Sequence, residues 1–286
     1  MNSSKLKWFL IVIFLAANVF FFIQYYNYSS LLNSYTEREL DTAVETLNKR
    51  GVKIDRSSVT LTKTVPPVLK LEYTDNSNES LAKHIMNDSF ASYMLPSGIS
   101  YTNDSETLIF FDSHSFEYTV TGTIAPDEDI IGLLRDGSSE QMKPYVKALH
   151  GRLFNQPITA PYKTTLKLVS YYIADERVII RVQQEINGIT IDRSEIIALF
   201  ERSELKYIKG NIFISDEVSE LEADSLDVIN LLFKIEKSDS KIVNIDKVYH
   251  PVTTDNGSLY LTPSYMLTYE NGNVHVWDAT SSSQRY

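Results

Sequence analysis

The chain has 286 residues, 43% of them hydrophobic, and a formal net charge of −10. Such an acidic chain is poorly suited to binding nucleic acid or anionic lipid. It contains no cysteine, which excludes disulfides, thiolate metal sites and cysteine nucleophiles.

The first predicted element is a hydrophobic run from Trp8 to Tyr26. Its 19 residues would form a helix roughly 28 Å long, close to the thickness of a bilayer core. A cleaved secretory signal has a shorter apolar region that ends at a small-x-small cleavage site. Here the small pair Ala16-Ala17 lies in mid-run and bulky residues follow it. We therefore predict an uncleaved signal anchor at residues 8–26, with a slowly cleaved signal as the alternative.

Charge predicts the orientation of this anchor. Lys5 and Lys7 precede it, and no charged side chain follows before Glu37. Because positive flanks stay in the cytoplasm, we predict a single-pass cell-membrane protein with a cytoplasmic tail at 1–7 and an extracytoplasmic C-terminal domain. Without the two lysines, 25 basic and 37 acidic side chains remain, a formal charge of −12. An outer domain without cysteine favours the surface of a monoderm bacterium.

Asn18 is a polar interruption of the apolar run. A single asparagine is tolerated in a membrane helix without any consequence. Alternatively, its amide bonds to a neighbouring helix, and the small residues Ala16 and Ala17 allow the close approach. Both interpretations remain open, and they make these three residues candidate partner contacts.

Residues 34–50 are predicted to form a juxtamembrane helix. Ser34 to Glu37 fit a capping box, and Gly51 follows two basic residues at the predicted C-terminal end. A narrow apolar stripe is formed by Leu40, Val44 and Leu47. We expect this stripe to pack on the outer domain or on the stalk of a partner.

The remainder predicts an α+β domain in which helices pack on an antiparallel sheet. A soft boundary near 136–139 divides it into an N-terminal subdomain at 52–136 and a C-terminal subdomain at 139–282. In the first, a strand after two prolines is followed by a helix and two further strands. These four elements are predicted at 65–73, 79–94, 107–111 and 115–124.

The C-terminal subdomain has the more regular pattern. Helices are predicted at 140–153 and, capped by Asp224, at 225–237. Asn187-Gly188 is a strong hairpin signal within a meander of four strands. The predicted strands of this subdomain are 164–173, 177–186, 189–200, 205–214, 247–250, 258–262, 265–269 and 274–278.

No catalytic, cofactor or metal site is predicted, and we expect the chain not to be an enzyme. The five histidines lack the spacing of zinc motifs, and the sequence has no phosphate loop or serine-nucleophile motif. His114 follows Asp112 in a pattern that β-turns use. Tyr171, Tyr172 and Trp277 would suit a sugar site, but such residues more often belong to the core or surface of strands. An anchor and an outer α+β domain without catalytic residues indicate a binding or regulatory protein.

Two segments of the second half carry a family resemblance. Residues 186–214 read INGITIDRSEIIALFERSELKYIKGNIFI, and residues 248–282 read VYHPVTTDNGSLYLTPSYMLTYENGNVHVWDATSS. Upstream there is a basic flank, an apolar anchor that contains Asn18-Val19-Phe20, the segment LNKRGVKI at 47–54 and a Pro-Pro strand. In this order the segments resemble the YycI family of regulators over most of the chain. The ending after Asp278 departs from the family's usual Ala-x-Thr-Gly-Glu and also resembles PepSY-type domains.

The resemblance implies a bitopic membrane protein without catalytic activity or cofactor. YycI-like proteins of low-GC Gram-positive bacteria act with a companion, YycH, on the sensor histidine kinase YycG (WalK) of the cell-wall two-component system. Their contacts run largely through transmembrane helices, with the outer domains contributing, so we expect a homo- or hetero-dimer. Ala16, Ala17 and Asn18 then become the candidate contacts. Two alternatives remain, a PepSY-like binding or protease-inhibitor module and an anchored cell-wall enzyme.

Overall fold

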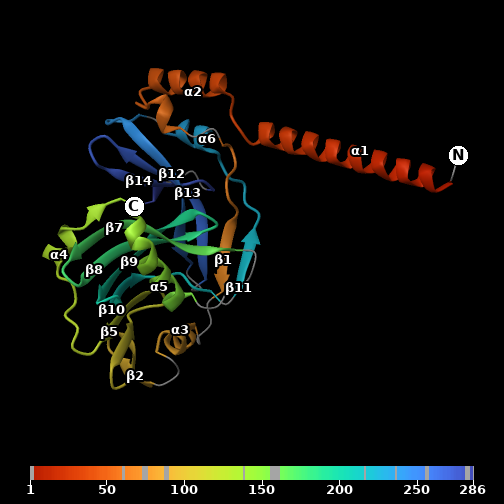
Figure 1. Cartoon of the computed structure of the whole chain (residues 1–286). Coiled ribbons are helices and arrows are strands. Elements are labelled where there is room, and N and C mark those ends of the chain that lie inside the picture. The colour runs from red at the N-terminus through yellow and green to blue at the C-terminus, as the bar shows by residue number, and fades with distance from the viewer. Residues whose placement is uncertain are drawn as a thin grey trace. The chain divides into compact units, whose positions relative to one another are not determined.

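The structure is a computed structural model of the whole chain (Figure 1). The residues that it describes are 3–59, 62–72, 77–86, 90–137, 139–154, 162–215, 217–235, 237–254, 258–280 and 284–285. Within helices and strands, the side chains that lie outside this description are those of residues 3–6, 9–10, 26–32, 77 and 284–285. The predicted end of the C-terminal subdomain at residue 282 lies outside the described residues.

The protein is of the α+β class, as predicted, and its sheet is mixed and mostly antiparallel. The described helices are α1 (Ser3–Leu32), α2 (Glu37–Lys49), α3 (Ser77–Met86), α4 (Glu128–Gly132), α5 (Lys143–Leu153) and α6 (Val228–Leu232). The first described strands are β1 (Val68–Glu72), β2 (Ala91–Leu95), β3 (Gly98–Thr102), β4 (Glu106–Phe110), β5 (Ser115–Val120), β6 (Arg135–Asp136) and β7 (Thr164–Ala174). The others are β8 (Arg177–Ile186), β9 (Ile189–Glu201), β10 (Glu204–Asn211), β11 (Glu217–Leu221), β12 (Ile242–Thr253), β13 (Leu259–Tyr269), β14 (Val274–Asp278) and β15 (Gln284–Arg285).

Hydrogen-bonded neighbours define the order of the strands. The longest path is β11-β1-β13-β12-β9-β10-β5-β4-β3-β2. From it, β14 and β15 continue beside β13, and β8, β7 and β6 continue beside β9. The pair of β12 with β9 is parallel.

The chain forms two compact units. Unit 1 contains Met1–Pro66, Ser225–Asp246 and Tyr265–Tyr286, and unit 2 contains Pro67–Asp224 and Lys247–Ser264. Each unit is assembled from segments that are far apart in sequence. The predicted boundary near 136–139 lies within unit 2.

The core of unit 1 forms around the apolar stripe of α2. Leu40, Val44 and Leu47 are buried, and they belong to one cluster with Ile229 and Leu232 around α6. The same cluster takes in the loop after α2, the start of β12 and the end of β13. The first expectation for the stripe, that it packs on the outer domain, is confirmed.

Four long strands, β7 to β10, form the predicted meander of unit 2. Neighbouring strands pair antiparallel. Asn187 and Gly188 have φ angles of 51° and 79°, as the favoured two-residue hairpin turn requires. The predicted turn is therefore confirmed.

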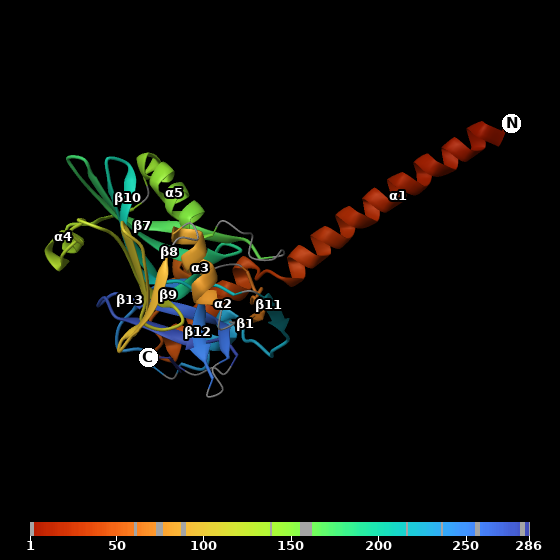
Figure 2. The same ribbon diagram turned by 90° about the horizontal axis from the view of Figure 1, so that it is seen from below.

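Helices lie on both faces of this meander (Figure 2). On one face, Leu149 of α5 is buried in a cluster with Ile180. On the other, Ile130 of α4 packs against Ile179 and Leu199. Because successive side chains of a strand point to opposite faces, the adjacent residues 179 and 180 serve the two clusters.

The helix predicted at 79–94 is wrong in its second half. The helix ends at Met86, and residues 91–95 form β2. Pro96 and Ser97 turn the chain directly into β3, and β2 pairs with β3 antiparallel. Pairing with the sheet therefore overrides the helical pattern there.

The helix predicted at 225–237 is also too long. It is reduced to α6, and Asp227 rather than Asp224 caps it, because the Asp227 carboxylate accepts a hydrogen bond from the backbone N–H of Asn230 at 2.9 Å. Ile235, beyond the helix, is nevertheless buried. The strands predicted at 258–262 and 265–269 are one strand, β13.

The prediction of a helix at residues 8–26 is confirmed, because α1 contains this whole segment. Among the residues that the structure describes, no helix qualifies as both long and apolar enough for a membrane span. The membrane anchor itself stays a prediction.

We expect Leu47→Ala to lower the free energy of unfolding by about 2–5 kcal/mol, because the Leu47 side chain is fully buried between α2 and α6. Chemical denaturation followed by circular dichroism measures the change. Val243→Ala is the control, because Val243 is 43% exposed and should change stability by no more than about 0.5 kcal/mol. Equal effects of the two variants would contradict the placing of the core.

Candidate functional site

The predicted contact residues of α1 lie among exposed apolar side chains. Asn18 is exposed, and its side-chain amide donates a hydrogen bond to the backbone carbonyl oxygen of Phe14 at 2.9 Å. Its second N–H and its side-chain oxygen bond to none of the described residues and can serve a neighbour. The large apolar side chains exposed on α1 are Trp8, Ile11, Val12, Ile13, Phe14, Leu15, Val19, Phe20, Phe21, Phe22, Ile23 and Tyr25.

Helix geometry divides the three predicted residues between two faces. Successive residues of a helix are rotated by about 100°. Ala17 is therefore about 100° from Asn18, and Ala16 about 200° from it. One neighbouring helix can contact Ala17 and Asn18 together, whereas Ala16 faces a second neighbour.

The residues between α1 and α2, Asn33 to Thr36, are fastened to unit 1; we call them the α1–α2 joint. The Asn33 carbonyl oxygen accepts a hydrogen bond from the backbone N–H of Lys63 at 2.7 Å. Ser34 forms an antiparallel bridge with Thr62. The Lys63 ammonium lies 4.7 Å from the ring centroid of Tyr35. Residues 62 and 63 thus hold the chain at the point where α1 ends.

Tyr35 connects the joint to the core of unit 1. It packs partly buried against the cluster of α2 and α6. Burial, and after it the neighbouring Asp227 carboxylate, raise the pKa of the Tyr35 hydroxyl far above its ordinary value. The same two causes raise the pKa of Tyr265. Both phenols therefore stay protonated beside the carboxylate that caps α6.

A capping box begins α2, but two residues later than predicted. The Glu39 backbone N–H donates to Thr36 Oγ1 at 3.2 Å, and the Thr36 backbone N–H donates to Glu39 Oε2 at 2.7 Å. The predicted first residue, Ser34, is part of the bridge to Thr62 instead. The hydrogen bond from the Thr36 backbone lowers the pKa of Glu39.

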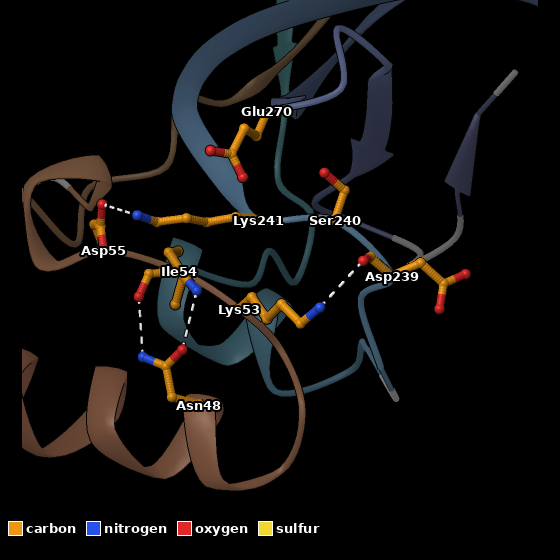
Figure 3. A pocket seen from close by; sticks show the side chains of 8 residues that line it. All are labelled: Asn48, Lys53, Ile54, Asp55, Asp239, Ser240, Lys241 and Glu270. Atoms are coloured by element: carbon orange, nitrogen blue, oxygen red, sulfur yellow. Dashed lines mark hydrogen bonds and ion pairs between the residues drawn. The ribbon is translucent and has the colours of Figure 1, made fainter.

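At the other end of α2, three segments of unit 1 surround an open pocket of about 420 Å³ (Figure 3). Asn48 of α2 fixes its lower wall, because its side-chain amide donates to the Ile54 carbonyl oxygen at 2.9 Å and accepts from the Ile54 N–H at 3.1 Å. The polar residues that line the pocket are Asn48, Lys53, Asp55, Asp239, Ser240, Lys241 and Glu270.

The charges around this pocket are incompletely paired. Lys241 Nζ lies 2.5 Å from Asp55 Oδ2. Lys53 Nζ donates to the Asp239 backbone oxygen at 3.2 Å and pairs with no carboxylate among the described residues. Glu270 points toward Lys241 (Figure 3) but makes no ion pair within the described chain. Hydrogen bonding to Asp55, and more weakly the charge of Glu270, raise the pKa of Lys241.

The histidines do not form a site within the described residues, where no group of metal-binding side chains occurs. His114 follows an Asp112 turn, in which Asp112 Oδ1 accepts from the His114 N–H at 2.7 Å, and its ring lies 4.9 Å from that of Phe213. Burial lowers the pKa of His114. His250 Nδ1 lies 2.8 Å from Asp192 Oδ2, and this partly buried pair was not indicated by the sequence.

Of the aromatic residues considered for a sugar site, Tyr171 and Tyr172 point to opposite faces of β7. Tyr171 packs against the cluster on the α5 face and Tyr172 against the cluster on the α4 face. Trp277 packs partly buried in the core of unit 1. Each belongs to a different hydrophobic cluster, as the core interpretation predicts.

No family model matches the chain, and no curated protein matches it. Similar solved structures include an uncharacterized protein from Eubacterium rectale, with a TM-score of 0.43, 12% identity and coverage of 82% of this chain and 89% of that chain. Another is the C-terminal domain of YpeB from Bacillus megaterium, with a TM-score of 0.33, 11% identity and coverage of 76% and 97%. At such low scores, neither likeness carries an inference about function.

We expect Thr36→Ala to lower the free energy of unfolding by about 1 kcal/mol, because the first turn of α2 loses its cap. The control is Thr46→Ala on the same helix, where alanine is the better helix former, so that no loss is expected. Denaturation of both variants beside the parent protein measures the difference. Equal losses would show that Thr36 contributes nothing as a cap.

The same cap should respond to pH. Because the pKa of Glu39 is lowered in the folded chain, its contribution is present at neutral pH and is lost as pH falls through that lowered value. Glu39→Gln should therefore be less stable than the parent at pH 7, and the gap should close in acid. Thermal melts across this pH range measure the gap, and a constant difference would contradict the assignment.

Proposed function

We propose that the chain is a membrane-anchored, non-catalytic regulator that acts through contacts of α1 and of its extracytoplasmic units. In its finer form, the proposal is a YycI-like regulator of a WalK-type sensor histidine kinase in the cell membrane, together with a YycH-like companion. The two segments at 186–214 and 248–282 support this form by their resemblance to that family.

The observation that carries the proposal is the fastening of α1 to unit 1. The α1–α2 joint is held by the Asn33–Lys63 hydrogen bond, the Ser34–Thr62 bridge and the Tyr35 contacts. From the joint, α2 continues with its buried stripe. Because the joint is held at these points, a displacement of α1 would also move α2 and its buried stripe. A protein that regulates through a membrane helix requires such a mechanical connection between the helix and the folded domain.

Two features of α1 suit contact with other helices. Its apolar side chains are exposed, and Asn18 has one N–H and one oxygen left for a neighbour. Since Ala16 and Asn18 face different directions, two helices can be accommodated. A kinase and a companion would supply two. A partner that binds two states of the kinase with different affinities shifts the balance between them.

We expect a photoreactive residue at Asn18 to crosslink, in native membranes, to a histidine kinase or to a YycH-like protein identified by mass spectrometry. Phe20 is the matched control, because it lies at nearly the same depth of the helix but about 200° around it. Adducts with one such protein at Asn18 and a different pattern at Phe20 are the expected result. Lipid adducts alone at both positions, with kinase activity unaffected by deletion of the gene, would reduce α1 to a tether.

A second candidate function is the binding of a small zwitterion in the pocket of unit 1, as an extracytoplasmic binding module. It is favoured by the Lys53 ammonium and the Glu270 carboxylate, which border one pocket and have no opposite charge bound among the described residues. A ligand that carries both an ammonium and a carboxylate would satisfy both. Free amino acids and short peptides have this chemistry.

For the pocket, we expect calorimetric titration with glycine, alanine and alanyl-alanine to detect binding of at least one probe. Lys53→Ala and Glu270→Gln should each weaken it about tenfold, since each removes a charge-assisted hydrogen bond. Lys234→Ala is the control, because Lys234 is an exposed lysine of unit 1 outside the pocket. Absence of binding by all three probes, or equal affinities in all variants, would exclude this function for the pocket.

A further inference from the structure

A short segment of unit 1 connects the pocket to the α1–α2 joint, and we call its residues 53–59 and 62–63 the strap. At one end, Lys53 and Asp55 line the pocket. At the other end, residues 62 and 63 bond to the chain directly after α1. The pocket and the joint lie at opposite ends of α2, whose 13 residues span about 20 Å. One stretch of chain therefore contributes to both places.

At the pocket, the strap is joined to the start of β12. The Ile242 N–H donates a hydrogen bond to the Lys53 carbonyl oxygen at 2.8 Å. Figure 3 shows the Lys241 side chain reaching toward Asp55 of the strap, with which it makes the ion pair. The Glu270 backbone N–H donates to the Lys241 carbonyl oxygen at 2.8 Å. Lys241 and Glu270 therefore belong to one fixed wall of the pocket, and the strap supplies another.

Along α2, the strap is held by burial and by charge. The side chains of Ile54 and Val59 are buried in the cluster of α2 and α6. The Arg56 guanidinium pairs with Glu37, and its Nε lies 3.4 Å from Asp41 Oδ1, so it is joined to the first two turns of α2. Because a close-packed interior yields little and transmits strain, a shift at one end of the strap is carried to the other end.

At the joint, the contacts of the strap are concentrated on Lys63. The Lys63 ammonium, which contacts the ring of Tyr35, also lies 3.8 Å from Glu39 Oε1 in the capping box of α2. The Lys63 backbone N–H donates to the Asn33 carbonyl oxygen at 2.7 Å. This N–H exchanges its hydrogen with solvent only when the joint opens. Its exchange rate therefore measures how firmly unit 1 holds the end of α1.

We propose that the strap couples the pocket to the α1–α2 joint, so that the zwitterion proposed above as the ligand of the pocket tightens the hold of unit 1 on α1; this coupling rests on that proposed function. The ligand contacts Lys53 and Asp55 on the strap and Lys241 and Glu270 on the fixed wall, and so ties the two together. Because these contacts are complete only when the strap is in place, the ligand binds that state better and shifts the balance toward it. The coupling is reciprocal, so a loosened joint weakens binding in the pocket.

The coupling can be tested on the full chain without any ligand. Asp55→Asn removes the ion pair between the strap and Lys241, and we expect the Lys63 N–H to exchange about two- to fivefold faster, as fits the loss of one exposed ion pair. Hydrogen exchange resolved to single residues measures the rate. Glu45→Gln is the matched control, because the Glu45–Lys49 pair is equally short and exposed but lies within α2 and outside the pocket.

A second measurement adds the ligand. Whichever of glycine, alanine and alanyl-alanine binds should slow the exchange of the Lys63 N–H in the parent chain. The Phe111 N–H of unit 2, which donates to the Ser115 carbonyl oxygen at 2.9 Å, should be unaffected. In the reverse direction, Lys63→Met loosens the joint and should weaken the affinity for that probe about two- to fivefold in a calorimetric titration.

Equal exchange at Lys63 in Asp55→Asn and Glu45→Gln would overturn the coupling. So would a probe that binds in the pocket without slowing this exchange. Absence of binding by all three probes would refute the function proposed for the pocket, whereas the comparison of Asp55→Asn with Glu45→Gln would still decide whether the pocket and the joint are coupled.

Discussion

The rest of unit 1 depends on the contacts of residues 62 and 63 with the chain directly after α1. A hydrogen bond to Asn33 and a bridge to Ser34 fix the backbone, and the cation–π contact fixes the ring of Tyr35. Because Thr36 then starts α2 at a defined point, Leu40 and Leu47 fall on the core side of that helix. The same ring brings the joint against the carboxylate that caps α6.

The predicted anchor, the edge strand β2 and the pocket of unit 1 differ from the rest of the chain in the charges that they carry. The predicted anchor has no charged side chain between Lys7 and Glu37, and the β2 edge has none between residues 89 and 103. The acidic surplus lies elsewhere on the chain. The pocket of unit 1 mixes both signs, and Lys241 and Asp55 neutralise each other there. In an acidic chain, the uncharged surfaces are where contact with another acidic molecule meets the weakest electrostatic repulsion.

Regular patterns could be read directly from the sequence. Segments rich in β-forming residues and separated by turn signals predicted the meander of β7 to β10, with every boundary within three residues of the structure. Asn187-Gly188 turned the chain as predicted, since both residues tolerate positive φ. For the residues of β2, the prediction from the sequence was wrong. Met94 and Leu95 look like the apolar positions of a helix, but they lie on an exposed edge whose conformation is decided by pairing with β3.

The sequence by itself determined the helix at 8–26, the apolar stripe of α2, the α+β class and the absence of thiol chemistry, because each follows from local composition or period. It placed the α2 cap at Ser34 rather than Thr36, since two overlapping Ser/Thr-x-x-Glu patterns are equivalent until the bridge to Thr62 engages Ser34. Only the tertiary structure decided which distant segments meet. The pocket of Lys53, Lys241 and Glu270, the Asp192–His250 pair and the uncovered edge of β2 all arise from contacts between residues that no local pattern links.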